Sequence, residues 1–324
     1  MELNAEPLPE ELEREAREFD EKIRERVHHG HIPDLRRMQP CDWFRNNVWR
    51  RPYLVNQMYS RWVQFCLDYL PPPGEHVLEV GCGPGYLSLE LARYGYHMVG
   101  LDISVAALEI AEQLVKENPF KESFGSICHV RDDFTRWRPS DGGLFDAAVF
   151  CVSLHHFPDP AGVLDHVLTM LSPDGRIVLC EPSRDWWTRN DGAVMALLRA
   201  VLAAAGHWYE EIPVPATQSE IEALVDECFD EVTEATPKDQ PRQSEMDNSC
   251  YGTEILRALE ERFDRIAYQP DTVLYSRIAP GARFDSEEQH KRFTQFLHTF
   301  ELYAIETKLL NPGIFMFAGE RRKA

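Results

Sequence analysis

A short, mostly apolar run followed by three closely spaced glycines constrains the fold of this chain more than any other segment. Residues 77–80, Val-Leu-Glu-Val, are typical of a buried strand, and Gly81, Gly83 and Gly85 follow at alternate positions. Glycines let the backbone turn tightly with no side chain projecting toward a ligand. Residues 86–92 then carry leucines at helical spacing, so the segment predicts a strand, a glycine-lined turn and a helix.

A second apolar run, residues 98–101, ends at Asp102, about twenty residues after the glycine turn. A carboxylate at this place can accept hydrogen bonds from both hydroxyls of a ribose. The dinucleotide-binding pattern has a further glycine directly after the position of Gly85, where the helix approaches a pyrophosphate closely. Tyr86 stands there instead, so the motif favours a nucleoside ligand without a pyrophosphate and disfavours NAD.

The two motifs, Glu-Val-Gly-Cys-Gly-Pro-Gly at 79–85 and Gly-Leu-Asp-Ile-Ser at 100–104, resemble motifs I and II of the class I S-adenosylmethionine (SAM)-dependent methyltransferases. SAM carries an adenosine and no phosphate, which agrees with the departure from the dinucleotide pattern. The resemblance implies that SAM is the cofactor, that the glycines let the backbone pass its methionyl end, and that Asp102 binds its ribose. It also implies cofactor contacts by other residues of these motifs, namely Glu79, Cys82 and Ile103.

An acidic turn carries the resemblance further along the chain. Residues 131–134, Arg-Asp-Asp-Phe, follow a strand candidate at 127–130. They look like the family's turn beside the adenine, where an acid accepts from the exocyclic amine and an apolar residue covers the ring. We favour Asp133 with Phe134, because the family usually places the acid directly before the apolar residue; Asp132 is the alternative.

A loop with two histidines follows the next buried strand candidate, residues 145–152, which contains Cys151 as another expected cofactor neighbour. The loop 153–159 is similar to a histidine-containing loop of many small-molecule methyltransferases. Histidine titrates near neutral pH, which suits a general base. His156 is therefore the predicted catalytic base and His155 the second candidate; a packed or solvent-bonded loop histidine is the alternative interpretation.

These elements predict an α/β fold, and the resemblance implies a Rossmann-like sheet of seven mostly parallel strands with an antiparallel last strand. A turn at 171–175 leads into the strand candidate 176–182, and residues 311–319 look like the last strand. We expect an N-terminal helical lid at 1–73, a SAM-binding core at 74–182, an inserted cap at 183–251, and a C-terminal part at 252–324 that completes the sheet and adds a helix.

Aromatic residues of the lid are candidates for the substrate site. Helix candidates at 9–27 and 53–70 form the lid by resemblance, and the second carries Tyr59 and Trp62. These side chains are candidates to line the pocket, although aromatic residues at helical spacing are more often part of the core.

The cap supplies a second set of aromatic candidates. Trp186 and Trp187 precede an apolar helix candidate at 193–205. An aromatic wall beside an active site would suit an apolar or aromatic substrate. Packing of the cap onto the core is an equal alternative. The polar, proline-containing stretch 236–247 predicts a loop, and residues 285–310 carry apolar side chains at helical spacing.

Composition narrows the class of protein. A net charge of −20 argues against binding to nucleic acid, which needs a basic surface. No apolar run reaches bilayer length and the N-terminus lacks the pattern of a signal peptide, so we expect no membrane partner and a cytoplasmic location. The eight cysteines are scattered without a C-x-x-C pair, and the histidines at 28–31 lack partners at ligand spacing, so no metal site is expected.

The sequence thus predicts an enzyme that transfers a methyl group from SAM to an oxygen, nitrogen or carbon of a small molecule by in-line displacement. Residues 151–155 lack the Pro-Pro turn of enzymes that methylate planar nitrogens. The paired-glutamate loop of protein arginine methyltransferases and the magnesium ligands of catechol-type enzymes are also missing. The alternatives are a protein or peptide methyltransferase, and a non-catalytic protein of this fold. The sequence carries no signal for the acceptor's identity or the oligomeric state.

Overall fold

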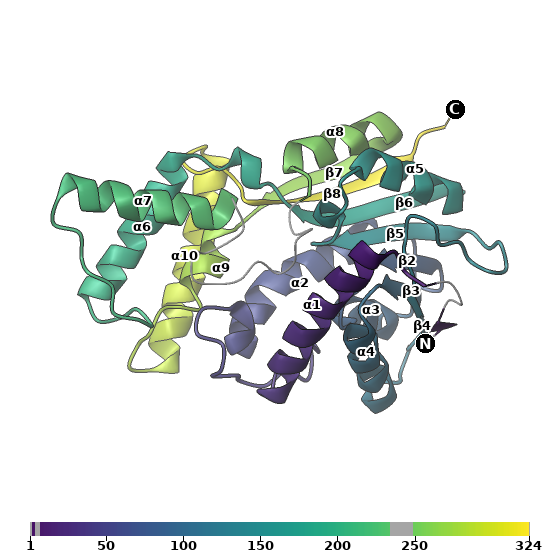
Figure 1. Ribbon diagram of the computed structural model, residues 1–324, viewed down its shortest axis with the longest axis horizontal. Coiled ribbons are helices and arrows are strands. Elements are labelled where there is room, and N and C mark those ends of the chain that lie inside the picture. Colours follow the sequence, from purple (N-terminus) through teal and green to yellow (C-terminus); the bar gives the residue numbers. More distant parts are fainter. Residues whose placement is uncertain (1, 4–6, 234–248, 324) are drawn as a thin grey trace.

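One central sheet with helices on both faces forms the molecule (Figure 1). The computed structural model describes residues 2–3, 7–233 and 249–323. Within these ranges eight strands pair in the order β1-β4-β3-β2-β5-β6-β8-β7. The strands are β1 (Glu2–Leu3), β2 (His76–Val80), β3 (His97–Asp102), β4 (Ser126–Arg131), β5 (Phe145–Cys151), β6 (Leu171–Pro182), β7 (Phe263–Asp271) and β8 (Ile314–Arg321).

Strand direction confirms the expected mostly parallel sheet with a reversed last strand. Strands β1 to β6 pair in parallel, whereas β8 is antiparallel to both of its neighbours, β6 and β7. The seven expected strands are joined by the two-residue β1 beside β4, a strand too short to show any periodicity in the sequence. The chain leaves β2 toward β3 on one side, and β5 lies on the other side, which creates a crevice at the carboxyl ends of these strands.

Alternation along the central strands explains the two helical layers. Leu78 and Val80 of β2 join one apolar cluster with the helices α5 and α8, while Val77 joins a second cluster with α2 and α3. Figure 1 shows α5 and α8 on one face and α1 to α4 on the other, with the cap helices α6 and α7 at the left. The helices of the described ranges are α1 (Glu10–His28), α2 (Pro52–Tyr69), α3 (Tyr86–Arg93), α4 (Val105–Glu117), α5 (Pro160–Met170), α6 (Arg189–Ala204), α7 (Gln218–Thr233), α8 (Gly252–Arg262), α9 (Leu274–Ile278) and α10 (Glu287–Glu306).

Two local differences separate the prediction from the fold, and one predicted loop is not described by the structure. The residues of the turn expected at 171–175 belong to β6. Leu171 pairs with Phe145 of β5 and Arg176 pairs with Ala147, so the residues between them form an irregularity within the strand. Helix α6 begins before residue 193, since Thr188 and Asp191 form a capping box. The loop expected at 236–247 lies outside the described residues.

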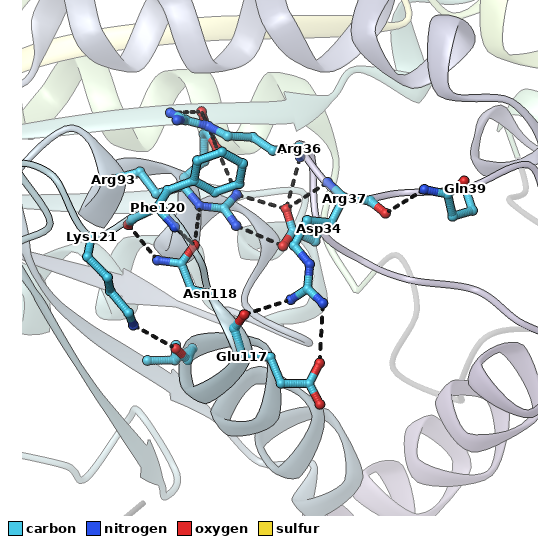
Figure 2. A network of polar contacts seen from close by, with 11 residues as sticks. Asp34, Arg36, Arg37, Gln39, Arg93, Glu117, Asn118, Phe120 and Lys121 are labelled. Atoms are coloured by element: carbon cyan, nitrogen blue, oxygen red, sulfur yellow. Dashed lines mark hydrogen bonds and ion pairs between the residues drawn. The ribbon is translucent and has the colours of Figure 1, made fainter.

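A buried ion pair fastens the segment between α1 and α2 to the core (Figure 2). The guanidinium of Arg93 donates to both oxygens of Asp34 at 2.8 and 2.7 Å, and both side chains are fully buried. Glu90 joins Arg93 to Arg36, and Asn118 accepts from the Nε of Arg93. Removing one partner of such a pair costs about 3–5 kcal/mol. This network therefore holds the lid segment in a fixed place against α3 and α4.

Candidate functional site

A cavity of about 620 Å³ opens at the carboxyl ends of β2, β3, β4 and β5. Helices α1 and α2 contribute another part of its wall, and residues near α9 and the start of β8 close the far end. Clefts at this edge of a doubly wound sheet are where such folds bind nucleotides.

The glycine turn leaves room for a ligand at one position. Gly81 and Gly83 have φ values of +70° and +52°, in the left-handed region that favours glycine. A Cβ on Gly81 would come within 2.6 Å of the Cβ of Ser153, whereas a Cβ on Gly83 would meet nothing within 4 Å. Gly85 does not line the cavity; a Cβ there would lie 2.8 Å from Ala111, so this glycine lets α3 approach α4.

The carboxylate of Asp102 joins the two motifs at the cavity wall. One oxygen accepts from the backbone N–H of Gly83 and the other from that of Ser104, each at 2.8 Å. Burial raises the pKa of Asp102, against the lowering effect of these backbone donors. Each oxygen keeps a second lone pair for a ligand hydroxyl. Asp102 and its neighbour Ile103 both line the cavity.

Glu79 gives the same wall a second acidic group. It lines the cavity and accepts a hydrogen bond from the hydroxyl of Ser88. Burial raises the pKa of Glu79 to about 8, and the nearby charge of Asp102 adds to this effect. A carboxyl with this pKa can be ionised by a cationic ligand group placed beside it. Cys82, at the start of the turn, also lines the cavity.

The acidic turn after β4 lies at the cavity with both of its carboxylates. Asp132, Asp133 and Phe134 all line the wall. Asp132 accepts from the backbone N–H of Asp133 at 2.7 Å, while Asp133 accepts from the backbone and hydroxyl of Thr135 and lies 3.1 Å from the Nε of Arg136. Both acids therefore help to close their own turn. The choice between them as the adenine partner stays a prediction.

Glu181, at the end of β6, organises the histidine loop. Its carboxylate is fully buried and accepts from the backbone N–H groups of Ser153 and Leu154, both at 2.8 Å. It also accepts from the backbone of His155 at 3.4 Å and lies 2.8 Å from the Nδ1 of that ring. The hydroxyl of Ser153 donates to the carbonyl of Val80 at 2.7 Å. The loop is thus tied to both β2 and β6.

The two loop histidines have different surroundings. His155 is 2% exposed, is directed to Glu181 and lies outside the cavity wall, which corrects its prediction as a second base. His156 ends the short 3-10 turn Leu154–His156 and lines the cavity. Its ring packs edge-on against Phe19, and its Nδ1 lies 3.9 Å from a carboxylate oxygen of Glu15. The loop and the helix α1 together position His156.

Polar contacts of Glu13 and Asp20 hold α1 over the cavity. Asp20 of α1 accepts from the hydroxyl of Ser104 at 2.6 Å and from the backbone of Ala106 at 3.0 Å. These donors lie at the N-terminus of α4, where a carboxylate is stabilised by the helix dipole. Glu13 pairs with Arg131, the last residue of β4, at 3.0 Å. The expected lid helix therefore closes on the strand ends that carry the candidate cofactor residues.

An aromatic cluster forms the wall beside α2. Tyr59 and Trp62 line the cavity, as the sequence predicted, and Trp49 and Tyr86 join them there. The ring centroid of Tyr59 lies 4.8 Å from that of Trp62, 5.4 Å from that of Trp49 and 5.2 Å from that of Tyr86. Tyr86 also lies 3.5 Å from the Sγ of Cys151, another predicted cofactor neighbour that lines the cavity. Trp49 was missed because its irregular segment shows no periodicity.

The structure does not bring the cap tryptophans to the cavity. Trp186 donates to the hydroxyl of Thr253 and packs on Phe315, while Trp187 is buried in the core cluster under the cap. The prediction that these two residues line the substrate site is corrected: the short turn Arg184–Trp186 directs Arg184 to the cavity and the indoles elsewhere. Within the described residues, no group of three or more acidic, histidine or cysteine side chains could hold a metal, and no helix could cross a membrane.

Comparisons with known proteins agree with this geometry. The family model described as "Methyltransferase domain" matches residues 51–227. The ubiquinone biosynthesis O-methyltransferases of Haemophilus ducreyi and Ralstonia nicotianae are each 30% identical, over 142 and 135 residues. These matches cover 44% and 42% of this chain and only 59% and 53% of the relatives' own length.

Solved structures share the fold at low sequence identity. The geranyl diphosphate C-methyltransferase from Streptomyces coelicolor A3(2) has a TM-score of 0.51 at 16% identity, over 98% of this chain and all of that one. The cyclase SpnF has a TM-score of 0.52 at 14% identity over the full length of both chains. The fold is therefore shared by proteins with different chemistry.

Replacement of Asp102 tests the cofactor part of the site. Asp102→Ala should weaken SAM binding by about 1.5–3 kcal/mol, because it removes charge-assisted hydrogen bonds to two hydroxyls and leaves those hydroxyls unpaired. Titration calorimetry measures the change. Asp174→Ala, which removes an exposed carboxylate paired with Lys323, is the matched control and should bind SAM normally. An unchanged affinity for the Asp102 variant would mean that the ribose lies elsewhere.

Proposed function

Because the chain belongs to the family of methyltransferase domains, we propose that it is an S-adenosylmethionine-dependent enzyme that methylates a small-molecule acceptor. The relatives are O-methyltransferases of ubiquinone biosynthesis, which supports a small-molecule acceptor for this chain. The finer proposal is that His156 acts as the general base. The acceptor atom, an oxygen, nitrogen or carbon, is left open.

One observation carries the proposal: a single cavity contains the candidate cofactor residues and His156. Asp102 lies at the end of β3 and the acidic turn at the end of β4. His156 follows the end of β5, which is separated from β3 by β2, at the same edge of the sheet. A cofactor bound along the strand ends would lie next to the histidine. The open space at Gly83 leaves room for a ligand beside the backbone of the turn.

The residues of the donor side bind and orient the cofactor. When bound, SAM supplies a methyl group that its sulfonium already activates. Asp102 holds the ribose hydroxyls, and Asp132 or Asp133 accepts from the adenine amine with Phe134 against the ring. Glu79, with its raised pKa, lies where it can accept from the methionyl ammonium as it ionises. These contacts fix the methyl donor, and the other walls of the cavity are free to bind the acceptor.

The residues of the acceptor side align the nucleophile and remove its proton. Correct alignment of two reactants supplies a large share of the rate in a displacement reaction. His156 takes the acceptor's proton or holds its hydroxyl in line with the methyl carbon. The aromatic wall of Trp49, Tyr59, Trp62 and Tyr86 excludes water and packs on an apolar or aromatic acceptor.

Transfer of labelled methyl groups tests the class of reaction. Incubation of tritium-labelled SAM with the protein and fractions of a cell extract should place the label in small metabolites. Label in polypeptides would instead indicate a protein methyltransferase, to which the acidic surface could attract a basic partner. If the protein binds SAM but no extract fraction gives label in small metabolites or in polypeptides, the protein is non-catalytic.

The His156 assignment is tested with the acceptor that this label identifies. His156→Ala should lower turnover about a hundredfold or more and leave SAM affinity near that of the wild type, because the side chain acts in the transition state. His76→Ala, at the opposite end of β2, is the matched control and should keep full turnover. If the His156 variant kept full turnover, and the unmodified enzyme showed no pH dependence near neutrality, alignment alone would account for catalysis.

A further inference from the structure

Apart from α1, which contributes Glu15, Lys22 and Arg26, the charged side chains of the cavity are segregated by wall. At the ends of β2, β3 and β4 the wall carries the carboxylates of Glu79, Asp102, Asp132 and Asp133. At the far end, near β6, α9 and β8, the described residues that line it contribute no carboxylate. They contribute two guanidinium groups instead, those of Arg184 and Arg277. Cations at this wall are notable in a chain of net charge −20.

The buried carboxylate of Glu301 and the side-chain amide of Asn46 fix the backbone that carries Arg277 at this wall. Glu301 of α10 accepts from the backbone N–H groups of Val273, Leu274 and Tyr275 at 2.7, 2.6 and 2.7 Å, which fixes the start of α9. Arg277 lies in this short helix, between the sheet and the cap. Its carbonyl accepts from the side-chain amide of Asn46 at 3.0 Å. The backbone that carries Arg277 is therefore held from two sides.

Among the described residues, the charge of Arg277 is only partly balanced. Its Nη1 lies 3.6 Å from one oxygen of Glu231, whose other oxygen pairs with the Nη2 of Arg199 at 2.6 Å. One carboxylate thus serves two guanidiniums, which leaves one positive charge in the trio. The Nε of Arg277 is buried and has no hydrogen-bond partner among the described residues, while about a third of the side chain is exposed, at 34%. A buried N–H without a partner is costly and calls for an external acceptor.

We propose that the methyl acceptor carries an anionic group, a carboxylate or a phosphate, which Arg277 binds together with Arg184. This inference rests on the proposed function and names the acceptor's chemical class. A guanidinium matches both oxyanions with paired N–H donors, and the acceptor's body would then extend along the aromatic wall toward His156. The carboxylates at the opposite wall repel an anion, so the charge pattern also fixes the acceptor's orientation.

Arg26 is the alternative partner for an anion in the cavity. Arg26 comes from α1, lines the cavity and lies near Tyr59. The ring of Tyr59 contacts that of Tyr86, the residue directly after the glycine turn. No carboxylate among the described residues pairs with its guanidinium, and burial lowers its pKa. Arg26 belongs to α1, whereas Arg184 and Arg277 lie together at the far wall near β6 and α9. The test therefore includes a variant of this residue.

Binding of three small probes tests the proposal without the natural acceptor. The protein is first saturated with S-adenosylhomocysteine, and 2-naphthoate, 2-naphthyl phosphate and neutral 2-naphthamide are titrated by calorimetry. At least one of the two anions should bind about tenfold or more tightly than the amide. Preference for naphthoate or for naphthyl phosphate identifies which anion the site fits.

Variants assign the preference to Arg277. Arg277→Gln should weaken binding of the preferred anion about tenfold or more and leave the amide unchanged, because it removes a charged donor. Arg277→Lys should restore part of that loss, since the charge returns without the paired donors. Arg265→Gln is the matched control: this exposed arginine of β7 pairs with Glu260 and does not line the cavity. It should bind every probe like the wild type.

Three results would overturn the inference. They are equal binding of amide and anions, failure of both anions to bind, and a loss of anion affinity that follows Arg26→Gln and not Arg277→Gln. The S-adenosylhomocysteine titration separates this inference from the function on which it rests. If the wild type failed to bind S-adenosylhomocysteine, the proposed function would be wrong; if it bound normally and the anions were not preferred, only the anionic acceptor would be rejected.

Discussion

The arrangement of the cavity depends on the buried carboxylate of Glu181. Its oxygens receive the backbone N–H groups of Ser153, Leu154 and His155 in an apolar interior, where each unsatisfied donor would cost about 1–3 kcal/mol. Through these bonds the end of β6 fixes the loop after β5, and the bond from Ser153 to Val80 adds the end of β2. Three strand ends and the catalytic candidate His156 are thereby held in one rigid unit.

The lid and the far wall are held in the same way, by hydrogen-bonded carboxylates that are buried, as in Asp34 and Glu301, or partly buried, as in Asp20. Asp20 holds α1 on the N-terminus of α4, Asp34 holds the following segment on Arg93, and Glu301 holds α9. Each acid satisfies backbone or guanidinium donors that would otherwise be left without partners. The result is a cavity whose donor wall is acidic and whose far wall is basic. This difference gives the two halves of the site separate binding roles.

Local motifs predicted the parts of the fold and site that depend on neighbours in the sequence. The glycine turn, Asp102 and the strands β2 to β5 were readable because their periodicity and turn residues lie within short windows. The two-residue β1 was missed, and the expected seventh strand, β7, was not located in the sequence, since neither shows an apolar alternation. Trp186 and Trp187 were placed wrongly because their direction depends on a single short turn. Arg184 and Arg277 carry no local signal, as only the fold brings them to one wall.

Amide hydrogen exchange of Glu181→Ala, with S-adenosylhomocysteine bound, tests most directly whether this carboxylate holds the histidine loop. In the wild type, the amides of Ser153 and Leu154 should be protected like those of the neighbouring strand β5. In the variant, the loop amides should exchange at least about tenfold faster while β5 keeps its protection, because only the loop loses its acceptor. Equal protection of the loop in both proteins, or an equal loss across β5 and the loop, would contradict the account.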